Sequence, residues 1–247
     1  MKKKIAIFVI SYKSVNLIIQ TINRIQKEVI DKVEEIYVID DYSKDNTYYA
    51  IKGYKVEKNL DKLNVYVNNK NLGYGGNQKT GYDYAIKKGY DIVVMLHGDG
   101  QYPPEQINEL LGPLENDEAD MVFGSRINTA LKGNMPLYKY FGNKLLSFIE
   151  NKFLKTSLSE FHSGFRLYNC HALKQVNYHE CSNDFEFDTD IIIKFVDKKL
   201  RIVEKPIPTY YGDEISHVKP FRYGFNCLKS VFKYWKSNRS YKNKLTK

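Results

Sequence analysis

Short apolar runs rich in valine, isoleucine and tyrosine recur along the chain, and stretches with helical spacing separate the first four of them. The runs are IAIFVIS (5–11), EIYVID (35–40), LNVYVN (63–68), DIVVML (91–96), DMVFGS (120–125) and LRIVEKPIP (200–208). Between the first two, apolar residues repeat at helical intervals: Val15, Ile18, Ile19, Ile22 and Ile25. This alternation predicts an α/β fold whose mostly parallel, Rossmann-like sheet carries helices on both faces.

The chain of 247 residues is long enough for one sizeable core, and no repeat, low-complexity stretch or linker divides it. We expect one domain over residues 1–220 and a basic amphipathic helix with a tail over 221–247. The opening MKKKIAIFVISYK imitates a signal peptide. However, Tyr12 and Lys13 end the apolar run early and no small-residue cleavage site follows, so we predict a first strand there. No later run approaches the roughly 20 apolar residues of a membrane span.

The formal net charge of +9 favours an anionic partner, which could be nucleic acid, a phosphorylated small molecule or an anionic membrane face. The three cysteines, Cys170, Cys181 and Cys227, are odd in number and lack the spacing of a metal finger or a redox pair. A reducing cytosol accounts for them most simply. We therefore expect a cytoplasmic protein, with a peripheral position on the cytoplasmic membrane face as the alternative.

Polar residues follow the first four predicted strands. They are Ser11 and Tyr12, Asp40 and Asp41, residues 68–71, and residues 97–101. In sheets of this class ligands bind at the carboxyl ends of the strands. The sequence therefore predicts one crevice lined by all four clusters.

The segment VIDDYSKDNT (38–47) places two carboxylates at a strand end. Ser43 and Asp45 can cap the next helix. Asp40 and Asp41 are harder to explain in that way, because a carboxylate in such a crevice accepts hydrogen bonds from ribose hydroxyls or from a base N–H. We expect them to contact a nucleoside.

The segment NLGYGGNQKTGYDYA (71–85) has Gly73, Gly75 and Gly76 ahead of a predicted helix. Such glycines suit phosphate binding at a helix start. The segment lacks the Lys-Ser/Thr ending of a P-loop and the glycine spacing of a dinucleotide site. A tight loop that packs the helix against the sheet is the alternative.

The stretch HGDGQ follows the fourth predicted strand. In an extended segment, alternation would turn His97, Asp99 and Gln101 to the same side. A hard divalent cation bound to a diphosphate needs few protein ligands, mainly oxygen atoms, and the imidazole suits Mn²⁺ at least as well as Mg²⁺. We expect a metal site here. The alternative is that Asp99 only caps the helix predicted in PPEQINELL.

Five motifs together carry a family resemblance. VIDDYSKDNT, NLGYGGNQKTGY, VVMLHGDGQYPPEQI, FGSR and EFHSGFRLY occur in the order and spacing of glycosyltransferase family 2, which has the nucleotide-diphospho-sugar transferase (GT-A) fold. The chain resembles dolichol- and polyprenyl-phosphate hexose synthases most, from about Ile5 to about His217. The resemblance implies a metal-dependent inverting enzyme of cell-surface glycan biosynthesis. Such an enzyme moves a hexose from a nucleotide-diphospho-sugar, with UDP or GDP as the nucleotide, to a polyprenyl phosphate or a glycan.

The resemblance also implies roles for individual residues. It assigns Ser11, Tyr12 and Asp41 to the nucleotide. Asp99 matches the second aspartate, and Gln101 the glutamine, of the family's metal-side Asp-x-Asp-x-Gln motif. His97 departs from that motif, because a neutral ligand replaces an anionic one and makes metal affinity weaker and more dependent on pH. The first strand lacks the family's usual proline, which leaves the nucleotide base open.

Arg126 in FGSR and Arg166 in SGFR match positions near the sugar and the phosphates, where planar, bidentate donors suit a diphosphate. The alternative for either is a structural ion pair. Asp188 in NDFEFDTDIIIK matches the catalytic base of members that glycosylate hydroxyls, and Glu160 is the second candidate. A lipid phosphate is already anionic and needs no base.

Two further features concern phosphates and membranes. The segment 206–224 resembles the family's closing segment, from which His217 and Lys219 would reach the diphosphate. Apolar residues recur at helical spacing among lysines in two stretches: Leu137, Phe141, Leu145, Phe148 and Ile149, and then Phe225, Leu228, Phe232 and Trp235. Such helices lie on anionic membranes, or they pack on a core or in a dimer.

Three rival functions predict other features. A sugar nucleotidyltransferase should have a Gly-rich loop with Arg or Lys after the first strand, where this chain has SYKSVN. A nucleic-acid-binding protein would use the net charge, but no recognition motif is evident and we expect no nucleic-acid partner. A catalytically silent nucleotide-sugar-binding protein would explain the departure at His97.

Overall fold

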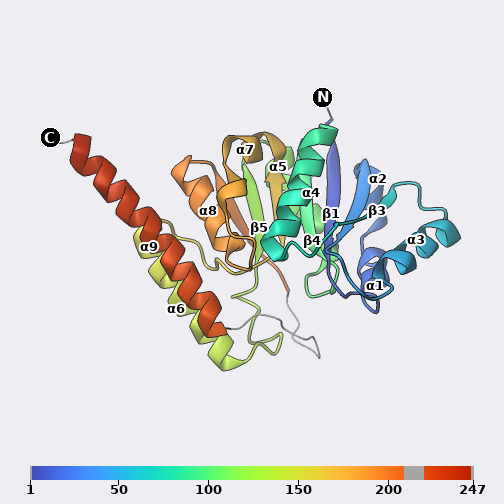
Figure 1. Ribbon diagram of the computed structural model, residues 1–247, viewed down its shortest axis with the longest axis horizontal. Coiled ribbons are helices and arrows are strands. Elements are labelled where there is room, and N and C mark those ends of the chain that lie inside the picture. The colour runs from blue at the N-terminus through green and yellow to red at the C-terminus, as the bar shows by residue number, and fades with distance from the viewer. Residues whose placement is uncertain (1, 209–219, 246–247) are drawn as a thin grey trace.

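The computed structural model describes residues 2–208 and 220–245, and it describes the side chains of the last helix as far as Ser237. Within this part of the chain, seven strands form one sheet in the order β3-β2-β1-β4-β6-β5-β7 (Figure 1). The strands are β1 (Ile5–Ser11), β2 (Glu35–Asp40), β3 (Leu63–Val67), β4 (Ile92–His97), β5 (Met121–Ser125), β6 (Arg166–Asn169) and β7 (Ile202–Pro206).

Helices connect the strands. They are α1 (Ile18–Asn23), α2 (Lys27–Lys32), α3 (Thr47–Lys58), α4 (Tyr74–Lys88), α5 (Ile107–Glu115), α6 (Leu137–Leu154), α7 (Cys170–Gln175), α8 (Phe187–Asp197) and α9 (Pro220–Leu245). Two short 3₁₀ helices are η1 (Pro104–Gln106) and η2 (Tyr178–Glu180). The alternation of strand and helix that the sequence predicts is confirmed, and the apolar start of the chain forms β1.

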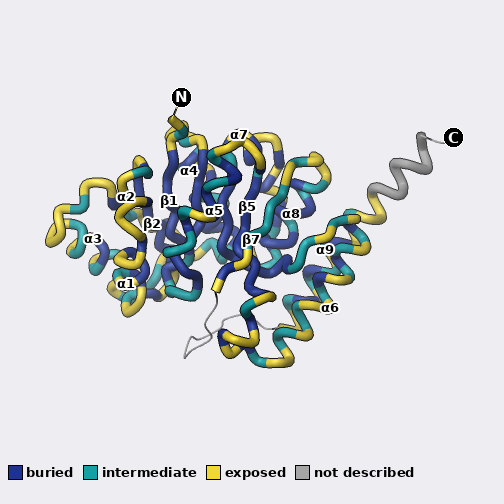
Figure 2. Tube along the Cα trace, turned by 180° about the vertical axis from the view of Figure 1, so that it is seen from behind, coloured by how far each residue is buried: buried dark blue, intermediate teal, exposed yellow. Residues whose placement is uncertain are grey.

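The alternation of side chains along β1 explains why the sheet has a core on each face. Ile5, Ile7 and Val9 pack in one core with residues of α1, α2, α3 and α5. Ala6 and Phe8 point the other way and pack with residues of α4, α7 and α8. Every residue of β1 is therefore buried, as expected for a central parallel strand covered on both sides (Figure 2).

Strand β6 is the one described strand that runs against its neighbours. It pairs antiparallel with β4 on one side and with β5 on the other, whereas β7 pairs parallel with β5. The sequence pattern did not predict this short strand. Because β6 is reversed, the residues just before Arg166 lie at the edge of the sheet where β4 and β5 end.

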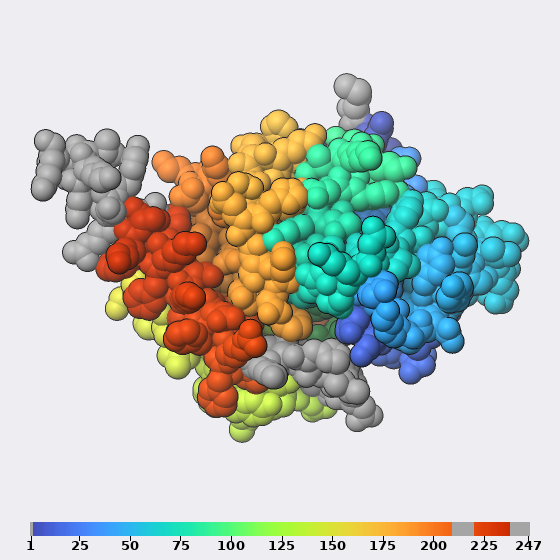
Figure 3. Space-filling view, viewed as in Figure 1, coloured from blue at the N-terminus to red at the C-terminus, as the bar shows by residue number. Residues whose placement is uncertain are grey.

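Helices α6 and α9 pack against each other at one side of the sheet, next to α8 (Figures 1 and 3). The Phe153 ring of α6 lies 4.6 Å from the Phe232 ring and 5.6 Å from the indole of Trp235, between ring centroids. Helix α9 begins at Pro220, one residue before the predicted segment 221–247, and ends at Leu245. No helix in the described residues is long and apolar enough to cross a bilayer.

Candidate active site

Parallel pairing brings the predicted strand ends to one edge of the sheet. Ser11 lies opposite Asp40 in the β1–β2 register, and Ile10 lies opposite His97 in the β1–β4 register. The ladder continues past the strands, because the Asp41 amide donates to the Ser11 carbonyl at 2.8 Å. Ser11, Asp40, Asp41 and His97 therefore lie at neighbouring strand ends, as expected.

The buried Asp41 carboxylate forms hydrogen bonds within the protein. It accepts hydrogen bonds from the Asn68 side chain and from the backbone amides of Leu72 and Gly73, each at 2.9 Å. These bonds fix the loop before α4. A nucleoside contact at Asp41 would have to replace or share them.

The glycines of this loop serve close packing. Gly73 has a φ of +80°, and a Cβ there would lie 2.6 Å from the Asn183 carbonyl oxygen. The amides of Gly75 and Gly76 donate to that same carbonyl at 2.8 and 3.2 Å. Because the amides at the start of α4 already have partners, the structure favours the tight-loop alternative over phosphate binding at Gly73.

Asp40 holds the turn after β2. Its carboxylate accepts hydrogen bonds from the Ser43 amide at 2.8 Å and the Ser43 hydroxyl at 2.6 Å. Burial raises the pKa of Asp40. The Ser43 hydroxyl oxygen also accepts from the Lys13 amide at 2.7 Å, so Ser43 ties the end of β1 to the end of β2.

The two residues at the end of β1 differ in exposure. Ser11 is buried, and its hydroxyl lies 2.7 Å from that of Ser14. Tyr12 is 42% exposed, and the Lys13 amine lies 5.2 Å from the centroid of its ring. Tyr12 therefore offers an accessible aromatic face to a nucleobase, whereas Ser11 does not offer an accessible hydroxyl.

His97 and Asp99 face each other at the end of β4. Nδ1 of His97 lies 4.0 Å from Oδ2 of Asp99, whose side chain is 45% exposed. The other oxygen of Asp99 accepts from the Gln101 amide at 3.0 Å. The segment turns at Gly100, which has a φ of +73°, so the expected extended conformation was wrong although His97 and Asp99 are brought together. No side chain caps α5, so Asp99 does not have the alternative capping role.

Tyr74 supports the imidazole of His97 from the other side. The Tyr74 hydroxyl lies 3.2 Å from Nε2 of His97 and donates to Oδ2 of Asp188 at 2.9 Å. A phenol has one proton to donate, and the carboxylate accepts it, so Nε2 of His97 must carry a proton and donate to the Tyr74 oxygen. In the neutral ring, Nδ1, which lies 4.0 Å from Oδ2 of Asp99, then keeps a free lone pair. Burial lowers the pKa of His97, which favours this neutral form.

Sequence reasoning missed Tyr74 and Gly164. Tyr74 lies within the motif that drew attention to Gly73, and its aromatic ring gave no separate signal. A Cβ at Gly164 would lie 2.5 Å from Nε2 of His97 and 2.8 Å from the Tyr74 hydroxyl. Only glycine therefore leaves room for this hydrogen bond.

Arg126, which follows β5, forms a buried ion pair with Glu160. Its Nε donates to Oε1 of Glu160 at 3.0 Å, and its backbone amide donates to Oε2 at 2.7 Å. The guanidinium also donates to the His162 carbonyl at 2.8 Å and lies 5.6 Å from the ring centroid of Tyr102. The carboxylate of Glu160 is thus committed to Arg126, which does not favour a role as a general base.

Arg166 is fully buried, and all three of its nitrogens have backbone partners. It donates to the carbonyls of Ser163 at 2.8 Å, Phe161 at 2.9 Å and Asp188 at 2.7 Å. Its Nε also lies 3.6 Å from a carboxylate oxygen of Asp188. This favours the structural alternative for Arg166. Asp188 is buried between Arg166 and Tyr74, and its role as a base stays a prediction.

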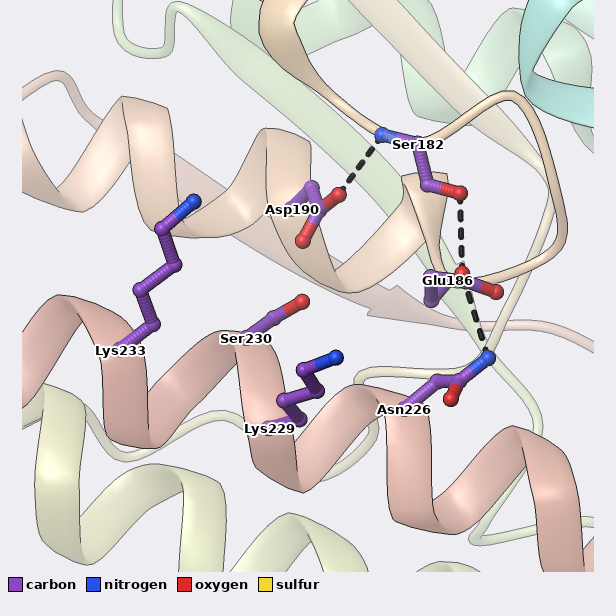
Figure 4. A pocket seen from close by; sticks show the side chains of 7 residues that line it. All are labelled: Ser182, Glu186, Asp190, Asn226, Lys229, Ser230 and Lys233. Atoms are coloured by element: carbon purple, nitrogen blue, oxygen red, sulfur yellow. Dashed lines mark hydrogen bonds between the residues drawn. The ribbon is translucent and has the colours of Figure 1, made fainter.

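His217 and Lys219 fall outside the described residues. A small polar hollow between α8 and α9 includes none of the residues at the strand ends, Ser11, Asp40, Asp41 and His97 (Figure 4). Its lining consists of Ser182, Glu186, Asp190, Asn226, Lys229, Ser230 and Lys233.

Comparison with known proteins identifies the family. The model for glycosyl transferase family 2 matches residues 6–176. A UDP-N-acetylglucosamine–dolichyl-phosphate N-acetylglucosaminyltransferase from Methanococcus voltae is 33% identical over 222 residues, which is 85% of this chain and 87% of that protein. The low-salt glycan biosynthesis hexosyltransferase Agl6 from Haloferax volcanii is 35% identical over 125 residues, which is 49% of this chain and 29% of that protein.

Solved structures share the fold at low sequence identity. Glucosyl-3-phosphoglycerate synthase from Mycobacterium tuberculosis, solved with Mg²⁺ and UDP, superposes with a TM-score of 0.71 at 13% identity and covers 95% of this chain and 80% of its own. Mannosyl-3-phosphoglycerate synthase from Rubrobacter xylanophilus gives 0.68 at 14% identity and covers 96% of this chain and 75% of its own. The predicted GT-A fold is thereby confirmed, and the family match favours a glycosyltransferase over the three rivals. The chain is an enzyme that belongs to glycosyl transferase family 2.

Proposed function

We propose that this protein transfers a sugar from a UDP-sugar to a polyprenyl phosphate, with Mn²⁺ or Mg²⁺ bound between His97 and Asp99. The observation that carries the proposal is the pair of ligand atoms at the end of β4, where Nδ1 of His97 and Oδ2 of Asp99 lie 4.0 Å apart. The named activity of the Methanococcus voltae relative supports the donor and the acceptor, and UDP-N-acetylglucosamine is the first donor to test.

The chemistry of the two residues fits a divalent cation. The hydrogen bond from Nε2 to Tyr74 leaves the Nδ1 lone pair of His97 free, 4.0 Å from Oδ2 of Asp99. A metal-bound histidine characteristically donates its other N–H to a fixed partner, and Tyr74 held by Asp188 is such a partner. Gln101 follows Asp99 closely and is proposed as a third metal-side group. When bound, the cation neutralises negative charge on the leaving diphosphate.

The carboxylates near the site support a phosphate acceptor. Deprotonation of a hydroxyl acceptor would need a free carboxylate near the sugar. Glu160 is bonded to Arg126, and Asp188 is bonded to Tyr74 and Arg166. A polyprenyl phosphate is already anionic and needs no base. We therefore favour the lipid phosphate over a glycan hydroxyl.

The helix pair α6–α9 supports a position on a membrane. Phe141 and Phe148 of α6 are 63% and 67% exposed, and Phe225 of α9 is 68% exposed. Exposed lysines lie on the same helices, at Lys144 and Lys229 among others. Aromatic residues interleaved with lysines suit the interface of an anionic membrane, where a polyprenyl phosphate would present its headgroup.

The donor half of the proposal is tested by calorimetric titration with UDP, GDP and dTDP, each with and without Mn²⁺. UDP should bind only with the metal, Asp99→Ala should abolish this binding, and the exposed control Asp61→Ala should retain it. UDP binding that is independent of metal, or unchanged in Asp99→Ala, would contradict the proposed metal site at His97 and Asp99. Absence of binding by all three nucleotides with Mn²⁺ would indicate a site without donor chemistry.

The acceptor half is tested by offering labelled UDP-N-acetylglucosamine and UDP-glucose with a short-chain polyprenyl phosphate. We expect label to transfer to the lipid phosphate from one of the two donors. Transfer to a glycan hydroxyl and none to the lipid phosphate would overturn this half while leaving the donor site in place.

A further inference from the structure

Three side chains of metal-ligand type meet in the interior, and none of them belongs to the set His97, Asp99 and Gln101. Glu150 comes from α6, His162 from the segment before β6, and Cys227 from α9. One ligand atom from each lies within 4.8 Å of the other two. All three residues are buried, with exposures of 0%, 8% and 0% respectively. They converge where helices α6 and α9 meet the segment that leads into β6.

Two facing atoms of this cluster lie at ion-pair distance but without the geometry of a hydrogen bond. Oε2 of Glu150 and Nε2 of His162 lie 3.3 Å apart, yet neither makes a hydrogen bond of acceptable geometry within the described residues. Buried polar atoms are nearly always bonded in folded proteins. A cation bound by both atoms would give each of them the partner that hydrogen-bond geometry does not supply.

The remaining atoms of the same side chains are held in place. Nδ1 of His162 lies 2.9 Å from the Tyr223 hydroxyl of α9. Oε1 of Glu150 accepts from the Thr189 hydroxyl of α8 at 3.3 Å. In metal sites such outer contacts orient the ligands, and they leave the other atom of each side chain free for the ion.

We propose that Glu150, His162 and Cys227 bind Zn²⁺. A thiolate, an imidazole and a carboxylate are ligands that zinc accepts together, whereas Mg²⁺ and Ca²⁺ select oxygen. Tetrahedral zinc with bonds of about 2.0–2.3 Å separates its ligand atoms by about 3.3–3.8 Å. The gap of 3.3 Å between Glu150 and His162 already meets this spacing. Zn²⁺ with one thiolate and one carboxylate is neutral overall, as burial requires.

The site would join the helix pair to the active site. Its ligands lie on α6, on α9 and in the segment between Leu154 and Arg166. The His162 carbonyl accepts a hydrogen bond from Arg126, and Glu160, two residues before His162, forms the ion pair with Arg126. The zinc would therefore fasten α9 to the segment that positions Arg126.

Cobalt is the probe that separates this site from the proposed donor site. The metal-free full-length chain is titrated with Co²⁺, both folded and during refolding from urea, so that slow entry into a buried site is not mistaken for absence. A thiolate-to-cobalt charge-transfer absorption should appear, saturate at about one equivalent, and disappear when Zn²⁺ displaces the cobalt. His97 and Asp99 contain no sulfur and cannot produce this absorption.

The control variants change another buried cysteine, Cys181, and a residue of the proposed donor site, Asp99. Cys227→Ser should lose the absorption, whereas Cys181→Ser and Asp99→Ala should retain it. Zn²⁺ should raise the melting temperature of the wild type and of Cys181→Ser by several degrees, and it should leave Cys227→Ser unchanged. No thiolate absorption in the wild type under either condition, or equal absorption in Cys227→Ser, would overturn the proposal, whatever the outcome of the nucleotide titration.

Discussion

The hydroxyl of Tyr74 lies 3.2 Å from Nε2 of His97, and this contact selects the tautomer of the neutral imidazole. Because Tyr74 gives its own proton to Asp188, it can only accept from the imidazole. The pair therefore determines which nitrogen of His97 is available to a metal, although Tyr74 itself does not reach the metal side.

Tyr74→Phe tests this relationship. Loss of the hydroxyl removes the partner of Nε2, so the ring can reorient and its tautomer is no longer fixed. We expect a loss of about 10–100-fold in Mn²⁺ affinity or activity, and a fall of about 1–3 kcal/mol in the free energy of unfolding because buried Asp188 loses a hydrogen-bond donor. Mn²⁺ titration in the presence of UDP measures it. Tyr178→Phe is the matched control, because that buried tyrosine donates its hydroxyl to Asp83 elsewhere. Equal effects of the two variants would contradict the assignment.

Gly164→Ala should damage the same contact by crowding. Its new Cβ would lie 2.5 Å from Nε2 of His97, so the ring must move. We expect activity to fall at least about tenfold and the free energy of unfolding to fall by about 1–3 kcal/mol. Gly53→Ala in α3 is the control, since outside its chain neighbours and helix backbone no atom lies within 4 Å of its Cβ. It should stabilise the helix by about 0.5–1 kcal/mol. Full activity in Gly164→Ala would show that His97 tolerates displacement.

The exposed face of α6 should control membrane binding. The double variant Phe141→Ser, Phe148→Ser removes two aromatic rings that the fold leaves exposed, so folding should be preserved. Partition onto anionic vesicles, measured by co-sedimentation, should weaken at least about tenfold, since each buried ring contributes about 1.5–3 kcal/mol. Tyr49→Ser, Val56→Ser on α3 is the matched control, because both residues are more than two-thirds exposed. Undiminished co-sedimentation of the α6 variant would exclude this face.

The Asp120–Arg201 pair should contribute stability that depends on pH. Arg201 bonds to both oxygens of Asp120, at 2.9 and 3.1 Å for its side-chain nitrogens, and lowers the pKa of Asp120 below its usual 3.8. A carboxyl whose pKa is lower in the folded state stabilises the fold above the unfolded pKa, and this contribution is lost as pH falls. Asp120→Asn should cost up to about 1 kcal/mol at pH 7, because the pair is partly exposed. Urea unfolding at several pH values should show the two proteins converge below about pH 4; a constant difference would contradict the assignment.

More of the sheet than of the candidate site could be predicted from the sequence. Short runs rich in Val, Ile and Tyr identify β1 to β5 and β7, because each strand has at least five residues with turn or helix signals on both sides. Strand β6 has four residues, one of them the buried Arg166, and this is too short to show a period. Its reversed direction depends on the pairing with β4 and β5, which no local pattern contains.

The convergence of Ser11, Asp40, Asp41 and His97 follows from parallel strands, so the sequence predicts it. The hydrogen-bond partners of the charged residues cannot be predicted from strand pairing in the same way. Tyr74 and Asp188 are 114 positions apart, and their contact exists only because α4 and α8 pack together. The same holds for Arg126 and Glu160, whose pairing decides between a phosphate contact and an internal ion pair. Motif spacing identified these residues, and tertiary contacts determine what each one bonds.

The reversed strand β6 determines where foreign sequence can be inserted. The chain enters β6 at the edge that carries His97, so extra residues just before Arg166 would push Gly164 into the active site. At the opposite edge, the exposed turn at Lys198 and Lys199 leads into β7. That turn is separated from the site edge by the length of a strand of five residues, about 17 Å. A fluorophore or affinity tag inserted there would report on the enzyme without entering the space where substrates meet.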